Sequence, residues 1–81
     1  MNESQVYETL NGIFRDVLDD DTIVLTPGTQ AADVQGWDSF AHINLIVAAE
    51  MKFGVKFITG EVESMKCAGD LVRLILAKKK P

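Results

Sequence analysis

Residues 36–54 read GWDSFAHINLIVAAEMKFG, and this stretch predicts a helix that begins at Asp38 or Ser39 and stops at Gly54. Asp and Ser are favoured at the start of a helix because their side-chain oxygens accept hydrogen bonds from its first amides. Glycine suits the left-handed residue that follows a helix, and Val55 is placed for the hydrophobic contact that accompanies such an end. Both ends of this helix are therefore marked in the sequence.

The predicted helix has two apolar sides, which is unusual for a chain of 81 residues. At about 100° per residue, its apolar residues form stripes on nearly opposite faces. One stripe is Leu45, Ile46, Ala49 and Phe53, and the other, called here the Phe40 stripe, is Phe40, Ile43, Val47 and Met51. Either the helix is buried all round in a bundle, or one stripe contacts a partner protein or a lipid-like cargo. We expect the Phe40 stripe to be exposed, because so small a domain has few residues to cover both faces.

On the N-terminal side, residues 4–18 predict a helix with one apolar face. Its apolar residues follow the spacing i, i+3, i+4, i+7, and they are Val6, Leu10, Ile13, Phe14 and Val17. Asn2 or Ser4 can cap its start, and the acids at 19–21 disfavour its continuation because a helix C-terminus repels negative charge.

Residues 19–37 form a long segment that reads neither as a strand pair nor as a helix of normal length. It contains the turn signal Thr26-Pro27-Gly28. Structureless loops this long are uncommon in compact domains and are often functional. We expect Leu25 and Val34 to hold this loop against the core.

On the C-terminal side, Thr59 is expected to cap a short helix that ends at about Met65, and a last helix is expected from Ala68 to Lys78. The last helix has one apolar side, formed by Ala68, Leu71, Val72 and Ile75. Runs 23–25 and 55–57 are too short to predict strands. We therefore predict an all-α fold in one domain, residues 1–81. It is a small bundle of three main helices, with a short helix before the last one and a long loop after the first.

Length and composition limit the function. Hydrophobic residues make up 47% and charged residues 25% of the chain, which is typical of a soluble globular domain. A domain of this size forms one modest core and hardly a deep, water-excluding cleft, so the length disfavours an enzyme. The net charge of −4 disfavours nucleic-acid binding and favours basic protein partners. We expect a monomer.

Single residues exclude other classes. The one cysteine, Cys67, cannot form an internal disulfide, and one histidine with one cysteine disfavours a metal site. Polar residues interrupt the apolar run 40–53, so we expect no membrane span. The start, Met1-Asn2-Glu3-Ser4-Gln5, has neither the basic nor the apolar region of a signal peptide, which predicts a cytoplasmic protein.

The motif Asp38-Ser39-Phe40 stands where the long loop meets the two-sided helix, near the middle of the chain. Alone it is a weak signal, since most such pairs are helix caps. Together with Phe53-Gly54-Val55 and Gly69-Asp70-Leu71-Val72, however, it gives a layout that resembles the acyl carrier protein family from about Val6 to Ile75.

In that family an Asp-Ser-Leu-type motif carries 4′-phosphopantetheine, derived from coenzyme A, on the serine hydroxyl. The resemblance thus implies a carrier rather than an enzyme, with Ser39 as the attachment site. It also implies as partners a phosphopantetheinyl transferase and acyl- or aminoacyl-loading and processing enzymes. The expected docking residues are Asp38, Phe40, Ile43, Val47, Glu50 and Met51.

Physical chemistry favours the same serine. A phosphodiester on Ser39 would lie beside unpaired amides at the positive end of the helix dipole, which favours an exposed anion by roughly 0.3–1 kcal/mol.

The pathway remains open among several alternatives. Fatty-acid carriers usually bear several acids on their second helix, whereas this chain has Ala41, Asn44, Val47 and Met51 at positions where acids are expected. These departures disfavour ordinary fatty-acid synthesis, and the resemblance favours a specialised pathway, such as polyketide-type or amino-acid-derived assembly. The expected pathway is accordingly a specialised, polyketide-type one or a fatty-acid-related one. An aminoacyl or peptidyl carrier is the alternative, and a helical adaptor that carries nothing, with Ser39 as a mere cap, is another.

The family also shelters cargo among its later helices, and the matching positions here are Ala49, Phe53, Phe57, Val62 and Met65. Because Phe57 and Met65 are bulky, we expect a small cavity and a short or polar cargo.

A catalytic triad of Ser39, His42 and Asp38 is a rival interpretation. The sequence has no glycine-rich oxyanion loop to complete it. The helical wheel also places His42 between Ala49 and Phe53, on the side assigned to the core. We expect His42 to be partly buried and bonded to the backbone.

Overall fold

The computed structural model describes residues 2–79, which form four α-helices and one short 3-10 helix. The helices are α1 (Glu3–Leu18), η1 (Ala31–Asp33), α2 (Ser39–Phe53), α3 (Thr59–Ser64) and α4 (Ala68–Lys78). No strand forms among the residues described. The predicted all-α fold is therefore confirmed.

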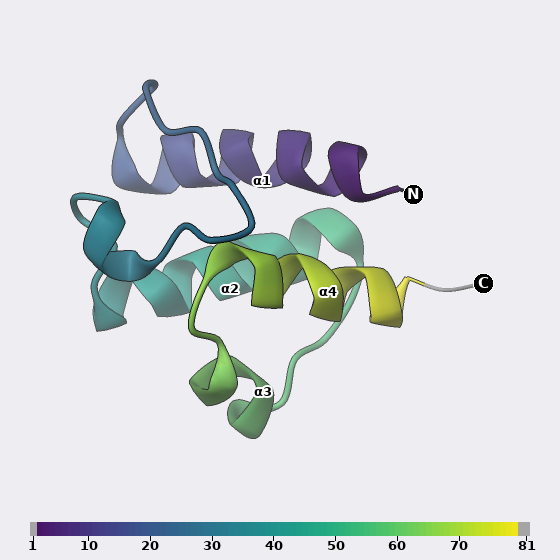
Figure 1. Ribbon diagram of the computed structural model, residues 1–81. Helices are drawn as coiled ribbons and strands as arrows, with labels where there is room; N and C mark the ends of the chain where they lie inside the picture. The colour runs from purple at the N-terminus through teal and green to yellow at the C-terminus, as the bar shows by residue number, and fades with distance from the viewer. Residues whose placement is uncertain (1, 80–81) are drawn as a thin grey trace.

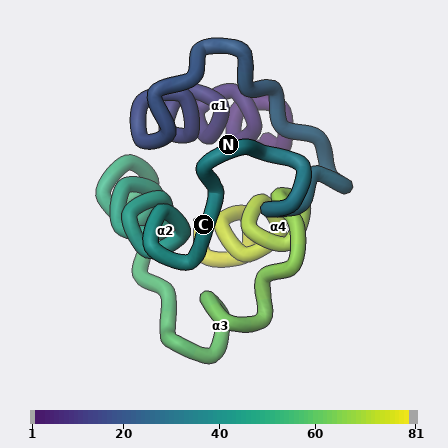
Figure 2. The backbone as a smooth tube through the Cα atoms, turned by 90° about the vertical axis from the view of Figure 1, so that its left-hand side faces the viewer, coloured from purple at the N-terminus to yellow at the C-terminus, as the bar shows by residue number. Residues whose placement is uncertain are grey.

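The three long helices form a triangular bundle, which Figure 2 shows end-on. Helix α1 lies across from α2 and α4, and α3 lies on the far side of that pair from α1, as Figure 1 also shows. The long loop after α1 passes over the end of the bundle before it enters α2. Ser39 therefore stands at the junction between this loop and the bundle.

The core lies among the inward faces of the long helices, and the residues predicted for it are buried. They are at most 8% exposed: Val6, Leu10, Ile13 and Phe14 of α1, Leu45, Ile46, Ala49 and Phe53 of α2, and Ala68, Leu71, Val72 and Ile75 of α4. Val17 is half-buried and packs against this cluster. Burying a large apolar side chain stabilises the fold by about 1.5–3 kcal/mol, so these helices are held by packing.

The long loop is fixed to α1 by polar side chains. The side-chain oxygen of Asn11 accepts a hydrogen bond from the Leu25 amide at 2.8 Å, and Arg15 Nε donates to the Ile23 carbonyl at 2.8 Å. The side chains of Ile23 and Leu25 are buried, while Val24 between them is exposed. Leu25 thus holds the loop as predicted, with Val34 half-buried against the core. The anchoring role of Ile23 was not predicted.

The same loop also binds the start of α4. The carbonyls of Thr29 and Pro27 accept hydrogen bonds from the Ala68 and Gly69 amides, at 2.8 and 3.1 Å. These bonds provide acceptors for the first two amides of α4, which have no partner within the helix. Cys67, the cap residue of α4, makes no side-chain capping bond and is only half-buried. A Cβ atom at Gly69 would lie 2.6 Å from the Pro27 oxygen, so glycine is required for this approach.

The structure decides between two predicted caps and corrects a third. Of the two candidates for α2, Asp38 is the cap and Ser39 is the first helical residue. The predicted cap Thr59 is wrong, because Thr59 lies inside α3, whose cap position is Ile58. The isoleucine side chain cannot accept a hydrogen bond, and instead Glu61 accepts one from the Ile58 amide at 3.0 Å. That bond lowers the pKa of Glu61, and the Lys78 ammonium 2.9 Å away adds to the effect.

The end of α2 agrees with its sequence signals. Gly54 adopts a left-handed conformation with φ of 68°, and Val55 behind it is buried. Glu50 then ties the following segment to α2, because its Oε2 accepts a hydrogen bond from the Phe57 amide at 2.8 Å. This carboxylate, expected in partner docking, has a structural partner within the domain.

Candidate functional site

Ser39 is exposed at the first turn of α2. The preceding residue, Asp38, accepts a hydrogen bond from the Ala41 amide at 2.8 Å through Oδ1, and one from the His42 amide at 2.8 Å through its carbonyl. The amides of Ser39 and Phe40 belong to the first turn, where the helix provides no acceptor. Asp38 therefore performs the capping, and the Ser39 hydroxyl remains accessible next to two helix-terminal donors.

Trp37 anchors the motif from the loop side. Its side chain is only 8% exposed and meets the edge of Phe14, with ring centroids 4.9 Å apart at 89°. Its Nε1–H donates to Nδ1 of His42 at 3.1 Å, and the two rings stack with centroids 6.0 Å apart. His42 is half-buried as expected, but it binds the indole rather than the backbone. The core position of Trp37 was missed, because a single residue in a loop forms no periodic pattern.

A hollow of about 390 Å³ lies between the start of α2 and the segment around α3, and Ser39 lines it. Its apolar lining includes Trp37, Val62 and Met65, and its charged lining includes Asp38, Glu63 and Lys66. Of the residues expected to shelter cargo, Val62 and Met65 therefore reach the hollow beside Ser39. Ala49 and Phe53 belong to the core, and Phe57 is half-buried against it.

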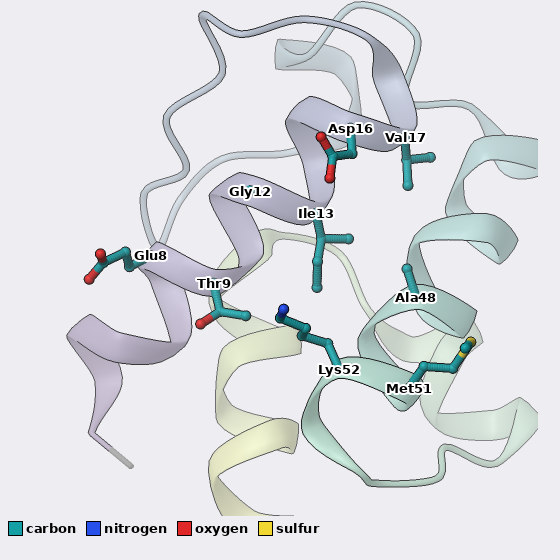
Figure 3. A pocket seen from close by; sticks show the side chains of 9 residues that line it. All are labelled: Glu8, Thr9, Gly12, Ile13, Asp16, Val17, Ala48, Met51 and Lys52. Carbon is teal, nitrogen blue, oxygen red and sulfur yellow. The ribbon is translucent and has the colours of Figure 1, made fainter.

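A larger groove of about 660 Å³ lies between α1 and α2, and Figure 3 shows it from close by. Ile13 and Val17 of α1 and Ala48 and Met51 of α2 line it, and Lys52 extends into the space between the helices. Ser39 does not line this groove. The larger cavity therefore does not include the serine. We take the smaller hollow as the candidate site, because Ser39 and the charged side chains of Asp38, Glu63 and Lys66 line it.

The Phe40 stripe is exposed along α2. Phe40 is 75% exposed, Ile43 61%, Val47 48% and Met51 81%. The alternative in which α2 is buried all round is therefore wrong. An exposed apolar row that begins beside Ser39 is available to a partner.

The rival triad finds no support in the geometry. Nδ1 of His42 is engaged by Trp37, and no hydrogen bond joins His42 to Ser39 among residues 2–79. Over the same residues, no cluster of three or more His, Cys, Asp or Glu side chains is arranged to hold a metal ion. Nor does any helix within that range have the length and apolar character needed to cross a membrane.

Comparison with known proteins places the chain in a family. It is 32% identical over 75 residues to the acyl carrier protein of Thermosynechococcus vestitus, and the match covers 93% of each chain. The chain belongs to the acyl carrier protein family. The acyl carrier protein of Helicobacter pylori strain 26695 is 30% identical over 70 residues, covering 86% of this chain and 90% of that protein. No protein-family model matches.

A solved structure agrees with this assignment. The solution NMR structure of the holo acyl carrier protein from Geobacter metallireducens superimposes with a TM-score of 0.83 at 47% sequence identity. The match covers 89% of this chain and 83% of that one. Acyl carrier proteins are carriers rather than enzymes, and their prosthetic group is phosphopantetheine as a general property of the family. Family membership thus argues against the adaptor alternative.

Proposed function

We propose that Ser39 is the attachment site of 4′-phosphopantetheine and that the chain carries acyl groups as thioesters on this arm. The observation that carries the proposal is the exposed Ser39 hydroxyl at the first turn of α2, which Asp38 leaves free of any capping role. Modification would join Ser39 Oγ to the pantetheine phosphate of coenzyme A and release the adenosine bisphosphate part. When bound, the group supplies the thiol that forms the thioester.

The residues around Ser39 fit such a group. The amides of Ser39 and Phe40 are donors at the positive end of the α2 dipole, which favours an exposed anion by about 0.3–1 kcal/mol. Lys66 lines the same hollow and adds a positive charge. Oδ1 of the nearby Asp38 carboxylate accepts a hydrogen bond from the Ala41 amide. These features support a phosphodiester at this position.

We further propose that partner enzymes dock on the Phe40 stripe, flanked by Asp38 and Glu50. The partners are a phosphopantetheinyl transferase and the enzymes that load and process the acyl group. The exposed positions Asn44, Val47 and Met51 are uncharged, which supports a specialised, polyketide-type pathway over ordinary fatty-acid synthesis, with a fatty-acid-related pathway as the alternative. Ala41 carries no weight in this argument, because it is buried. The charged lining of the hollow, with Glu63 and Lys66, favours an aminoacyl or peptidyl carrier as the second candidate.

The attachment is tested by incubating the chain with coenzyme A and a broad-specificity phosphopantetheinyl transferase. Intact-mass measurement is expected to show one added phosphopantetheine on the wild type and none on Ser39→Ala. Since Asp38 is the cap, Ser39→Ala loses less than the ~1 kcal/mol of a removed cap and keeps its helical circular dichroism. Ser4→Ala, which changes an exposed serine of α1, is the matched control and is expected to be modified. An unmodified wild type or a modified Ser39→Ala would overturn the proposal.

A further inference from the structure

The Trp37–His42 pair lines the hollow together with Ser39, and the proposed attachment assigns it no role. Indole nitrogen is a donor only, so Nδ1 of His42 must be an acceptor without a hydrogen. The neutral imidazole therefore carries its one hydrogen on Nε2. Trp37 is buried against Phe14, so the donor that selects this tautomer has a fixed position.

The Nε2–H group of His42 remains available to a ligand. Among residues 2–79, the His42 ring makes one hydrogen bond, to Trp37. In that range, every side-chain nitrogen or oxygen of a buried or half-buried residue that is closed off from solvent has a hydrogen-bond partner. Nε2 of His42 has no such partner. Nε2 is consequently in contact with solvent. His42 lines the hollow together with Ser39, three residues earlier on the same side of α2.

The charges around the hollow suit a neutral donor at this point. Asp38 at the start of α2 and Glu63 of α3 are acidic, and Lys66 after α3 is basic. A phosphodiester on Ser39 adds an anion to this group, and Nε2–H can bind its oxygen without taking up a proton. Val62 and Met65 provide apolar contacts for the carbon chain that follows.

We propose that His42 is a positioning residue for the arm: its Nε2–H donates a hydrogen bond to a non-bridging phosphodiester oxygen, and Trp37 holds the ring in the required tautomer. This inference rests on the proposed attachment to Ser39. The hydrogen bond from His42 directs the first part of the arm into the hollow between α2 and α3.

Phosphorus NMR of the modified protein tests the contact. At a pH of about 8, where imidazole is ordinarily neutral, the phosphodiester resonance of the wild type is expected to differ from that of a short peptide with the same arm. In His42→Ala the resonance moves to the peptide value. In His42→Gln it stays close to the wild type, because the amide N–H can replace Nε2–H. Nuclear Overhauser contacts between the arm and Met65 are expected in the wild type and in His42→Gln, and they are expected to be lost in His42→Ala.

The tautomer is tested before any modification, on the full chain. Nitrogen NMR of wild-type His42 is expected to show hydrogen on Nε2 alone. Trp37→Phe keeps an aromatic ring but cannot donate, so both tautomers become populated. Mixed tautomers already in the wild type would contradict the role given to Trp37.

Asn44→Ala serves as the control, because Asn44 is exposed on α2 and does not line the hollow. It is expected to leave the phosphorus resonance unchanged. If the wild type is modified but its resonance equals that of the peptide, or if His42→Ala leaves it unmoved, the inference is wrong while the proposed attachment stands. If the wild type is never modified, both the proposed attachment and the inference about His42 are wrong. Circular dichroism verifies the fold of each variant, and His42→Gln retains the test if His42→Ala fails to fold.

Discussion

Gly69 controls how closely the long loop approaches α4. Its amide donates to the Pro27 carbonyl, and its missing side chain leaves room for the Pro27 backbone. Asp70 next to it accepts a hydrogen bond from the Lys66 amide, which lowers the pKa of Asp70, and the Arg73 guanidinium adds to this effect. The start of α4 is therefore joined to two segments that come before it in the chain.

Gly69→Ala is expected to destabilise the fold, because its Cβ would lie 2.6 Å from the Pro27 oxygen and the loop would have to move. Overpacking of this kind typically costs about 1–3 kcal/mol in the free energy of unfolding. Urea unfolding measures the loss, and amide NMR shifts at residues 27–29 report the movement. Gly12→Ala in α1 is the matched control. A Cβ there meets nothing within 4 Å, so the better helix former should stabilise by about 0.5–1 kcal/mol. Equal effects of both changes would contradict the proposed contact.

At the scale of elements, the long helices are predictable from the sequence and the site geometry only in part. Apolar periodicity predicted the buried faces, since a helix repeats its contacts every few residues. Trp37 and Ile23 are buried because the long loop contacts the bundle at these residues. A loop has no repeating pattern, so the sequence does not predict which of its residues make contact. Choosing Asp38 over Ser39 as cap likewise depends on one backbone torsion, because both residue types cap well.

One apolar face of helix α2 is buried in the core, and the other, the Phe40 stripe, is exposed. Val47→Ala and Met51→Ala are expected to melt within a few degrees of the wild type, because Val47 is 48% and Met51 81% exposed. Both are expected to be poorer transferase substrates, as measured by the initial rate of modification. This docking should weaken little with added salt, since few charges flank the stripe.

Leu71→Ala is the comparison, since Leu71 is 2% exposed in the core and its loss should cost about 2–5 kcal/mol. If Val47→Ala and Met51→Ala destabilise as strongly, the stripe belongs to the core. If all variants are modified at the wild-type rate, partners dock elsewhere.

At the scale of the whole molecule, the small core limits the room for cargo. Ala49 and Phe53 are enclosed by the bundle, and the residues that line the hollow near Ser39 include charged ones. We therefore expect acyl groups attached through the arm to raise the melting temperature only while they are short. Thermal melts of the chain loaded with acyl groups of increasing length measure this. Ser39→Ala treated in the same way is the control. A steady rise to long chains would indicate deep burial and contradict the prediction.

The hydrogen bonds from α4 to Pro27 and Thr29 join segments about forty residues apart. A ribosome makes the loop well before it makes the helix whose amides the loop accepts, and contacts of such separation close late. During synthesis, the segment that leads into Ser39 thus lacks one of its two anchors. If Ser39 carries the arm as proposed, we expect a half-made chain that lacks α4 to be a poorer target for modification than a finished one.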